Sequence, residues 1–234
     1  MQDNQHKLEE QIRVHELKMA RSVRRARAFE KIGKVWSLAI LVMIVIVFSL
    51  FQGRIFTAAY WQSTLAYMTE IILLGIGEGL VMMAGCIDLS IGCLSGLVGV
   101  SAAVFIKNTC AALGDGPSIL IGVAIGLLIG VACGALNGVL VTKLKLSPFL
   151  ATIGTMSVCK GLALVISGGT EVVSLPAVMK EIANYKLFGF ATMNMMISWL
   201  VVLIFVFVLR FTRFGQYTYA VGSNRDALQR SGVN

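Results

Sequence analysis

The sequence predicts an all-α, polytopic integral membrane protein with about six transmembrane helices. Hydrophobic residues make up 57% of the chain and charged residues only 14%, with a mean hydropathy of +0.82, whereas a soluble domain has about 25% charged residues. The apolar residues also form runs of about the 20 residues that a helix needs to cross a bilayer. These runs lie near residues 35–53, 65–85, 89–106, 118–142, 149–167 and 194–211. Six such spans leave no room in 234 residues for a soluble catalytic domain.

The basic residues predict the orientation of the spans. The first apolar run begins only after 34 polar residues, which is too far from the amino terminus for a signal peptide, and no small-x-small cleavage site follows it. We therefore interpret this run as an uncleaved span. With a cytoplasmic tail, six crossings place residues 1–34, 143–147 and 212–234 inside. Of the 20 Lys and Arg residues, four lie in the outer segments (Arg54, Lys107, Lys180 and Lys186), Lys160 lies within a span, and the rest lie in or beside the inner segments. The positive-inside rule therefore predicts a cytoplasmic amino terminus in a plasma membrane.

The tail 1–34 is predicted to lie on the membrane surface. Leu8, Ile12, Met19 and Val23 fall on one helical stripe, and basic side chains occupy the opposite half. Anionic lipid headgroups are therefore a simpler partner for the net charge of +8 than nucleic acid. Val14 and Leu17 interrupt the stripe, so a solvated tail is the alternative.

The sequence lacks the patterns of a metal, nucleotide or catalytic site, and we expect no cofactor. His6 and His15 stand in the basic tail without a second ligand at metal-binding spacing, and no phosphate-binding glycine loop is present. The cysteines show no Cys-x-x-Cys spacing and fit small packing residues. They are Cys86, Cys93, Cys110, Cys133 and Cys159.

Asp88 interrupts an otherwise apolar run between the second and third spans. A carboxylate at membrane depth costs about 2.5–3.5 kcal/mol on insertion scales, so it needs a structural or functional reason. Because Asp88-Leu89-Ser90 precedes a helical span, its carboxylate can accept bonds from the first free N–H groups of that helix. Two interpretations stay open: a helix cap that holds a tight break, or a direct part in gating or the permeation path.

The fourth span carries glycine at every fourth position. Such a series forms a groove into which another helix packs closely, although glycine is also simply frequent in membrane helices. We expect the third and fourth spans to be interior helices, packed through this series: Gly122, Gly126, Gly130, Gly134 and Gly138.

Three further ionisable residues lie at membrane depth, namely Glu70, Glu78 and Lys160. Such residues are candidates for a substrate path. The alternatives are a place near the outer headgroups for Glu70, and snorkelling to the interface or pairing with another charge for Lys160. No relay of acids and histidines accompanies them, which argues against a proton-coupled carrier.

Three stretches share a family resemblance. The first is Gly85-Cys86-Ile87-Asp88-Leu89-Ser90-Ile91-Gly92. The second comprises Asn137-Gly138-Val139-Leu140-Val141, residues 147–156 and Gly161-Leu162-Ala163. The third comprises Thr212-Arg213-Phe214-Gly215, residues 219–224 and Ser231-Gly232-Val233. In this order they resemble the signatures of the membrane permeases of bacterial ABC importers for ribose, xylose, galactose and related sugars.

The resemblance implies a permease subunit of an ATP-driven, binding-protein-dependent sugar importer, without enzymatic activity of its own. Its partners would be a second permease subunit, cytoplasmic ATPase subunits and a periplasmic sugar-binding protein. Residues 35–211 would form the permease domain and residues 212–234 a cytoplasmic coupling loop, with a short coupling helix over 224–231. An ordinary basic inner loop is the alternative for the last segment. The residues assigned to ATPase coupling are Gly215, Tyr219, Gly222, Asn224, Arg225 and Gly232. The signature of the helix break contributes Gly85, Asp88, Ser90 and Gly92.

The chain departs from the family pattern at several positions. Cys86 replaces a usual Gly and Glu78 an uncharged residue, and Ser223, Arg225 and Leu228 stand where Gly, Pro and Ala are common. Family members continue for several more spans, so the chain is expected to be the amino-terminal part of a permease. An ion-coupled secondary transporter and a non-transporting membrane scaffold are the competing functions. The sequence displays no cluster of polar and aromatic residues that would bind a sugar, and selectivity is expected mostly from the binding protein.

Overall fold

The computed structural model describes residues 36, 38–187, 189 and 191–233. The predicted basic tail 1–34 and its surface helix lie outside these residues. The described residues divide into two compact units, with the boundary between Trp61 and Gln62.

In the first unit the described residues form a helix over Leu38–Phe51, the short 3₁₀ helix η1 over Gly53–Phe56 and the first residues of α2. The N–H and hydroxyl of Thr57 both donate to the carbonyl of Arg54, at 3.0 and 2.7 Å, and close the turn between η1 and α2. Tyr60 and Trp61 form an edge-to-face ring pair with centroids 6.3 Å apart.

Among the described residues, five helices are long and apolar enough to span a membrane, which confirms the all-α, polytopic fold. They are α2 (Ala58–Met83), α3 (Ile91–Leu113), α4 (Asp115–Thr142), α5 (Pro148–Ser167) and α7 (Met193–Phe211). The first predicted span, 35–53, corresponds to Leu38–Phe51, which is shorter than these five in the described chain. α2 begins at Ala58 rather than near residue 65, and α3 continues to Leu113 rather than 106, because a helix extends through polar residues as long as its backbone bonds form.

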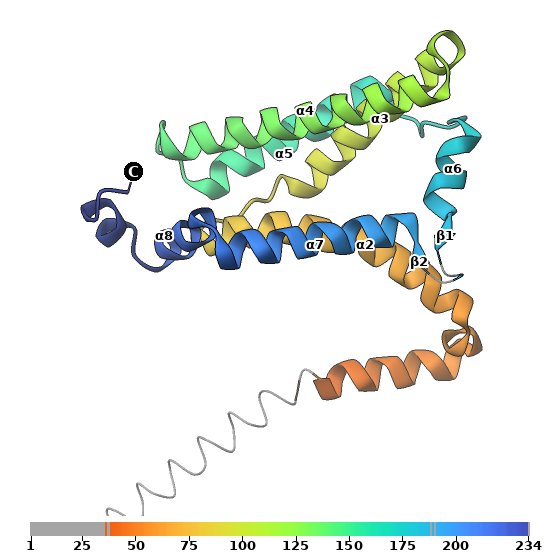
Figure 1. Cartoon of the computed structure of the whole chain (residues 1–234), viewed down its shortest axis with the longest axis horizontal. Coiled ribbons are helices and arrows are strands. Elements are labelled where there is room, and N and C mark those ends of the chain that lie inside the picture. Colours follow the sequence, from red (N-terminus) through yellow and green to blue (C-terminus); the bar gives the residue numbers. More distant parts are fainter. Residues whose placement is uncertain (1–35, 37, 188, 190, 234) are drawn as a thin grey trace, which may run out of the picture. The chain divides into compact units, whose positions relative to one another are not determined.

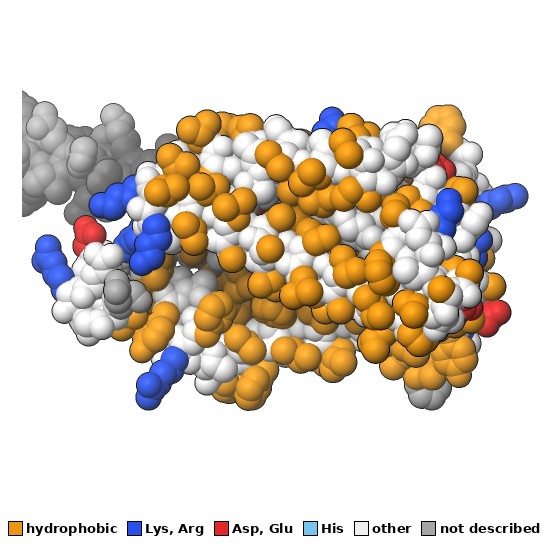
Figure 2. Space-filling model, turned by 90° about the horizontal axis from the view of Figure 1, so that it is seen from above, with side chains coloured by type: hydrophobic (Ala, Val, Ile, Leu, Met, Phe, Trp, Pro, Cys, Tyr) orange, Lys and Arg blue, Asp and Glu red, His pale blue; other side chains and the backbone are white. Residues whose placement is uncertain are grey.

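Apolar side chains cover the outside of these helices. Figure 2 shows hydrophobic side chains along the helical surface, with Lys and Arg gathered mainly toward the helix ends. In the most apolar stretch of 18 residues, only 6% of the residues of α2 and 11% of those of α4 are buried within the described chain. Such an outward-facing apolar surface is stable in lipid and not in water.

α3, α4 and α5 form a three-helix cluster, in which they lie side by side (Figure 1). Gly122 and Gly126 are buried against α3: an added Cβ at Gly122 would lie 2.5 Å from Ile106, and one at Gly126 would lie 3.0 Å from Val98. The other three members of the series, Gly130, Gly134 and Gly138, have no atom of the described chain within 4 Å of an added Cβ. The close approach of α3 and α4 thus depends on the first two glycines of the series, Gly122 and Gly126.

The segment between α5 and α7 holds a short helix and a small hairpin. α6 covers Ala177–Asn184, and strands β1 (Lys186–Leu187) and β2 (Ala191–Thr192) pair antiparallel. The ammonium group of Lys186 donates to Oε1 of Gln62 at 3.1 Å, and Nε2 of Gln62 donates to the carbonyl of Gly189 at 3.2 Å. These two bonds attach the hairpin to α2.

Replacing Gly122 or Gly126 with leucine is expected to separate α3 from α4, since either side chain would overlap α3. Overpacking of this kind costs about 1–3 kcal/mol. Thermal unfolding in detergent should show a clear drop in midpoint. Gly130→Leu is the matched control, and an equal drop in that variant would contradict the packing described above.

Candidate functional site

α2 ends in a tight turn that requires glycine at position 85. The N–H of Gly85 donates to the carbonyl of Met82 at 3.0 Å, and the N–H of Cys86 donates to that of Val81 at 3.1 Å. This is a Schellman motif, whose residue after the C-cap adopts a positive φ. Gly85 has φ +82°, which a side chain would disfavour.

Beyond this turn the chain doubles back along α2. The N–H of Asp88 donates to Oε1 of Glu78 at 3.2 Å, and the side chain of Ile91 lies 3.2 Å from an added Cβ at Gly77. α3 therefore starts beside Gly77, about 9 Å before the end of α2 at 1.5 Å per residue. The break of residues 84–90 is re-entrant, and it carries its polar groups back to the depth of Glu78.

A chain of hydrogen bonds joins the break to α4 and α5. The hydroxyl of Thr155 donates to Oδ1 of Asn137 at 2.5 Å, and Nδ2 of Asn137 donates to Oγ of Ser90 at 3.1 Å. The hydroxyl of Ser90 then donates to Oδ1 of Asp88 at 2.6 Å. Ser90 is fully buried, and Asn137 and Thr155 are exposed by only 6% and 7%. Each donor faces the next acceptor, and the series ends at a carboxylate, which makes the last bond charge-assisted.

The cap expected from Asp88 differs in detail. Ser90, not Asp88, occupies the N-cap position of α3, and no side chain there accepts a capping bond. Oδ1 of Asp88 instead accepts the N–H of Ser90 at 2.8 Å, together with the hydroxyl of the same residue. Ser90 has helix-like dihedral angles, φ −81° and ψ −18°. Its N–H therefore occupies the position beside the Asp88 carboxylate where we expected the first N–H groups of α3.

The remaining polar residues near the break have different surroundings. Oε2 of Glu78 is buried without a hydrogen-bond partner among the described residues, which leaves half of that carboxylate unsatisfied. Gly92 has nothing in the described chain within 4 Å of an added Cβ. Lys160 is exposed on α5.

α8 (Arg213–Arg230) follows α7 after a sharp turn. Thr212 accepts the N–H of Gly215 at 3.5 Å, and an added Cβ at Gly215 would overlap the backbone of Leu209. The helix is kinked at Asn224, whose dihedral angles are φ −158° and ψ 97°. Oδ1 of Asn224 accepts the N–H of Ala227 at 2.9 Å and so caps a second helical piece. The structure thus contains a helical piece close to the predicted 224–231, but residues 213–223, expected as loop, are helical too.

The first part of α8 contacts the break directly. An added Cβ at Gly222 would overlap the carbonyl oxygen of Met83, the last residue of α2. A cavity of about 330 Å³ beside this contact is lined by Ala84 and Cys86 of the break, by the end of α4 and by α8, including Arg225. Only glycine allows α8 to approach the end of α2 this closely.

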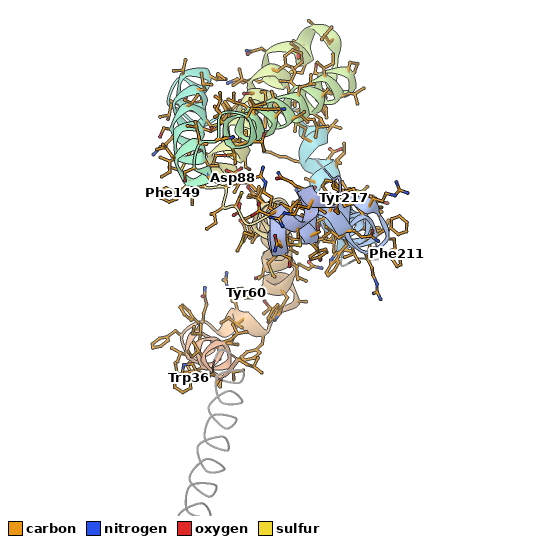
Figure 3. All side chains as sticks on the ribbon, turned by 90° about the vertical axis from the view of Figure 1, so that its left-hand side faces the viewer. Trp36, Tyr60, Asp88, Phe149, Phe211 and Tyr217 are labelled. Carbon is orange, nitrogen blue, oxygen red and sulfur yellow. The ribbon has the colours of Figure 1, made fainter. Side chains whose placement is uncertain are left out.

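A second cavity, of about 420 Å³, opens on the hydrogen-bonded chain itself. Its lining includes Asp88, Asn137, Thr152 of α5 and Phe214 and Thr218 of α8. Figure 3 places Asp88 between the cluster of α3, α4 and α5 and the ribbon of α7 and α8. The structure therefore brings together the signature at Asp88 and the start of α8, whose sequences are more than a hundred residues apart.

Not all predicted site residues meet at this place. Gly134 and Gly138 line the 420 Å³ cavity, whereas Gly122 and Gly126 pack against α3. Tyr219 is exposed on α8, and Gly232 ends the segment with φ +86°. Within the described residues no group of three or more His, Cys, Asp or Glu side chains is placed to hold a metal ion, and the five cysteines are free.

Asn137 and Thr155 are the site residues to which sequence reasoning gave no role. Both stand in the stretches that carry the family resemblance, and an amide or hydroxyl within an apolar span is a signal for a hydrogen bond between helices. Which groups they bond could not be read from spacing, because Ser90 and Asn137 are 47 positions apart.

Comparison with known proteins identifies the family. Residues 60–234 match the family described as "Branched-chain amino acid transport system / permease component". The chain belongs to this family of transport permeases. The match covers the break, the hydrogen-bonded chain and α8.

Curated relatives support the assignment. The chain is 31% identical over 163 residues to the autoinducer 2 import system permease protein LsrC of Yersinia pestis (strain Pestoides F) and of Yersinia pseudotuberculosis (serotype O:1b, strain IP 31758). It is 32% identical over 166 residues to LsrC of Yersinia enterocolitica (serotype O:8). These matches cover 70% of this chain and 43–44% of the relatives, so the chain spans less than half of their length. No solved structure matches.

Asn137→Ala is expected to destabilise the permease, because it leaves the buried hydroxyl of Ser90 without its donor and that of Thr155 without its side-chain acceptor. Ser90 still donates to Asp88, and Thr155 can donate to the carbonyl of Ala151, so the cost is that of the two lost hydrogen bonds, about 0.5–1.5 kcal/mol each. Unfolding in increasing SDS should occur at a lower denaturant fraction. Asn184→Ala is the matched control, since Asn184 is exposed and bonds only within α6. Equal stability of the two variants would contradict a structural role for the chain of bonds.

Gly222→Ala is expected to displace α8 from the end of α2, since the added methyl group would overlap the carbonyl of Met83. Limited trypsin cleavage after Arg225 and Arg230 should then become several-fold faster, because cleavage follows local opening. Gly130→Ala adds the same methyl group to a helix at an open position and should leave the rate unchanged. A normal cleavage rate in Gly222→Ala would show that α8 does not depend on this contact.

Proposed function

We propose that the chain is the permease subunit of an ATP-driven, binding-protein-dependent importer for sugars or sugar-like molecules. Membership of the permease family and the five spanning helices support a role in forming a translocation path. The observation that carries the ATP-driven mechanism is the contact of α8 with the break, because it connects a charged helix to the membrane interior.

In this proposal the amino terminus and α8 lie in the cytoplasm. The distribution of Lys and Arg supports this orientation. Residues 212–234 then form the coupling segment, in which the piece capped by Asn224 contacts an ATPase subunit. Arg225 and Arg230 supply exposed positive charge there.

The remaining partners follow from this arrangement. A second permease subunit would complete the path, and a periplasmic binding protein would deliver the substrate. The names of the LsrC relatives make autoinducer 2 a substrate to test beside ribose, xylose and galactose. Hydrolysis of ATP would occur in the separate cytoplasmic subunits.

Association with the cognate ATPase tests the proposal. The chain, in the membrane assembly in which it is expressed, should co-purify with the ATPase, and its presence should make hydrolysis respond to loaded binding protein. Uptake that continues after ATP depletion and follows an ion gradient would instead indicate a secondary transporter. No association and no uptake would indicate a non-transporting scaffold.

Replacing residues 225–230 with a Gly/Ser linker is expected to abolish the response of ATP hydrolysis to loaded binding protein. The linker removes the capped helical piece while leaving α7 and the first part of α8 in place. A linker of equal length in place of α6 (Ala177–Asn184) is the control. Unchanged stimulation in the 225–230 variant would reject the coupling role of this segment.

A further inference from the structure

A third cavity lies away from the break, between α2, α3 and α7. Its volume is about 350 Å³, within the range of small-molecule sites. Five of its eight lining residues are polar, an unusual share for the surface of spanning helices: Tyr67, Thr69, Glu70, Ser95 and Asn194. We name this cavity the α2–α3–α7 cleft.

Glu70 shows that lipid does not fill this cleft. The residue is exposed and lies near the middle of α2, which runs from Ala58 to Met83. Its Oε1 atom accepts one long hydrogen bond from the hydroxyl of Ser95, at 3.4 Å. Exposure of a carboxylate to hydrocarbon costs about 2.5–3.5 kcal/mol, and such residues face a water-filled space or the interior of an assembly.

The lining chemistry fits a neutral molecule with several hydroxyl groups. Glu70 supplies a strong acceptor, Ser95 a hydroxyl that both donates and accepts, and Asn194 an amide that does the same. Tyr67, 79% exposed, offers an aromatic face against which the C–H groups of a ring can pack. Three helices each contribute polar groups, so the cleft can contact such a molecule from several sides.

The same lining disfavours an anionic substrate. It contains no Lys or Arg to bind a carboxylate or phosphate, and the charge of Glu70 would repel either group. The family description mentions branched-chain amino acids, but this cleft offers no Lys or Arg to bind their carboxylate.

We propose that the α2–α3–α7 cleft is a water-filled segment of the substrate path that binds the hydroxyl groups of a neutral, polyhydroxylated substrate. This inference rests on the proposed function and names the residues that would contact the substrate. Thr69 helps to shape the cleft: it is buried, and its hydroxyl donates to the carbonyl of Leu65 at 3.2 Å.

Thiol accessibility tests whether water fills the cleft. In a version of the chain with its five cysteines replaced by serine or alanine, Ser95→Cys and Asn194→Cys are treated in proteoliposomes with a charged methanethiosulfonate. We expect modification at least about tenfold faster than for Ile71→Cys, because the reagent attacks the thiolate, which forms in water. Ile71 is the matched control, since it is adjacent to Glu70, 68% exposed and outside the cleft. Equal rates for all three variants would overturn the proposal.

Protection by ligands tests the chemical class. High concentrations of autoinducer 2 or D-ribose should slow the modification of Ser95→Cys several-fold, and L-leucine should not. Adding Glu70→Gln should weaken that protection, whereas Lys160→Gln, which also neutralises an exposed charge within a span, should not. Protection by leucine alone, or by none of the three compounds, would overturn the assignment of a hydroxyl-binding cleft.

These measurements need neither ATP nor the ATPase subunits. They can therefore fail while the chain still associates with its ATPase, and they can succeed if that association fails. The two outcomes separate an error in the cleft from an error in the proposed function.

Discussion

The structure depends on how a membrane protein satisfies polar groups where water is scarce. The chain of donors from Thr155 through Asn137 and Ser90 ends at the carboxylate of Asp88, and it connects α5, α4 and the break between α2 and α3. Neighbouring bonds in the chain share the side chains of Asn137 and Ser90, so each bond orients the group that makes the next one. The position of α3 relative to α4 and α5 follows from this chain as well as from the packing of Gly122 and Gly126.

This constraint explains why the break can be re-entrant. Residues 84–90 lie outside α2 and α3, and irregular backbone of this kind is tolerated at membrane depth only where protein or a water-lined cavity surrounds it. Gly85 satisfies the end of α2 through its Schellman turn, and Glu78 accepts the N–H of Asp88. The contact of Gly222 with Met83 then places the charged helix α8 against a segment whose polar groups already bond to α4 and α5. Motion of α8 would therefore bear on the whole three-helix cluster rather than on a loose loop.

The sequence predicted the fold class and the location of the break, because both depend on local composition. Runs of apolar residues locate spans, and Asp88 marks an interruption whatever its partners are. The partners themselves could not be predicted. Asp88 was expected to accept bonds from the first free N–H groups of α3, whereas it accepts the N–H and the hydroxyl of Ser90, which is buried and also bonds to Asn137. Likewise, glycine at every fourth position cannot show that only Gly122 and Gly126 meet another helix, since that depends on the crossing of α3 and α4.

Two glutamates on α2 have different hydrogen-bond partners, and these partners separate a structural role from a ligand-binding role. Glu70 and Glu78 are separated by two turns, about 12 Å along the helix. Glu78 is tied by Oε1 to the backbone of the break, so a substrate would have to compete with a bond that holds the fold. Glu70 has only a long bond to Ser95 and opens on a cleft with other polar groups. The two acids look alike in the sequence. Glu70 is the one that can exchange its weak bond to Ser95 for a hydrogen bond to a substrate, because its carboxylate can still accept hydrogen bonds in a polar cleft.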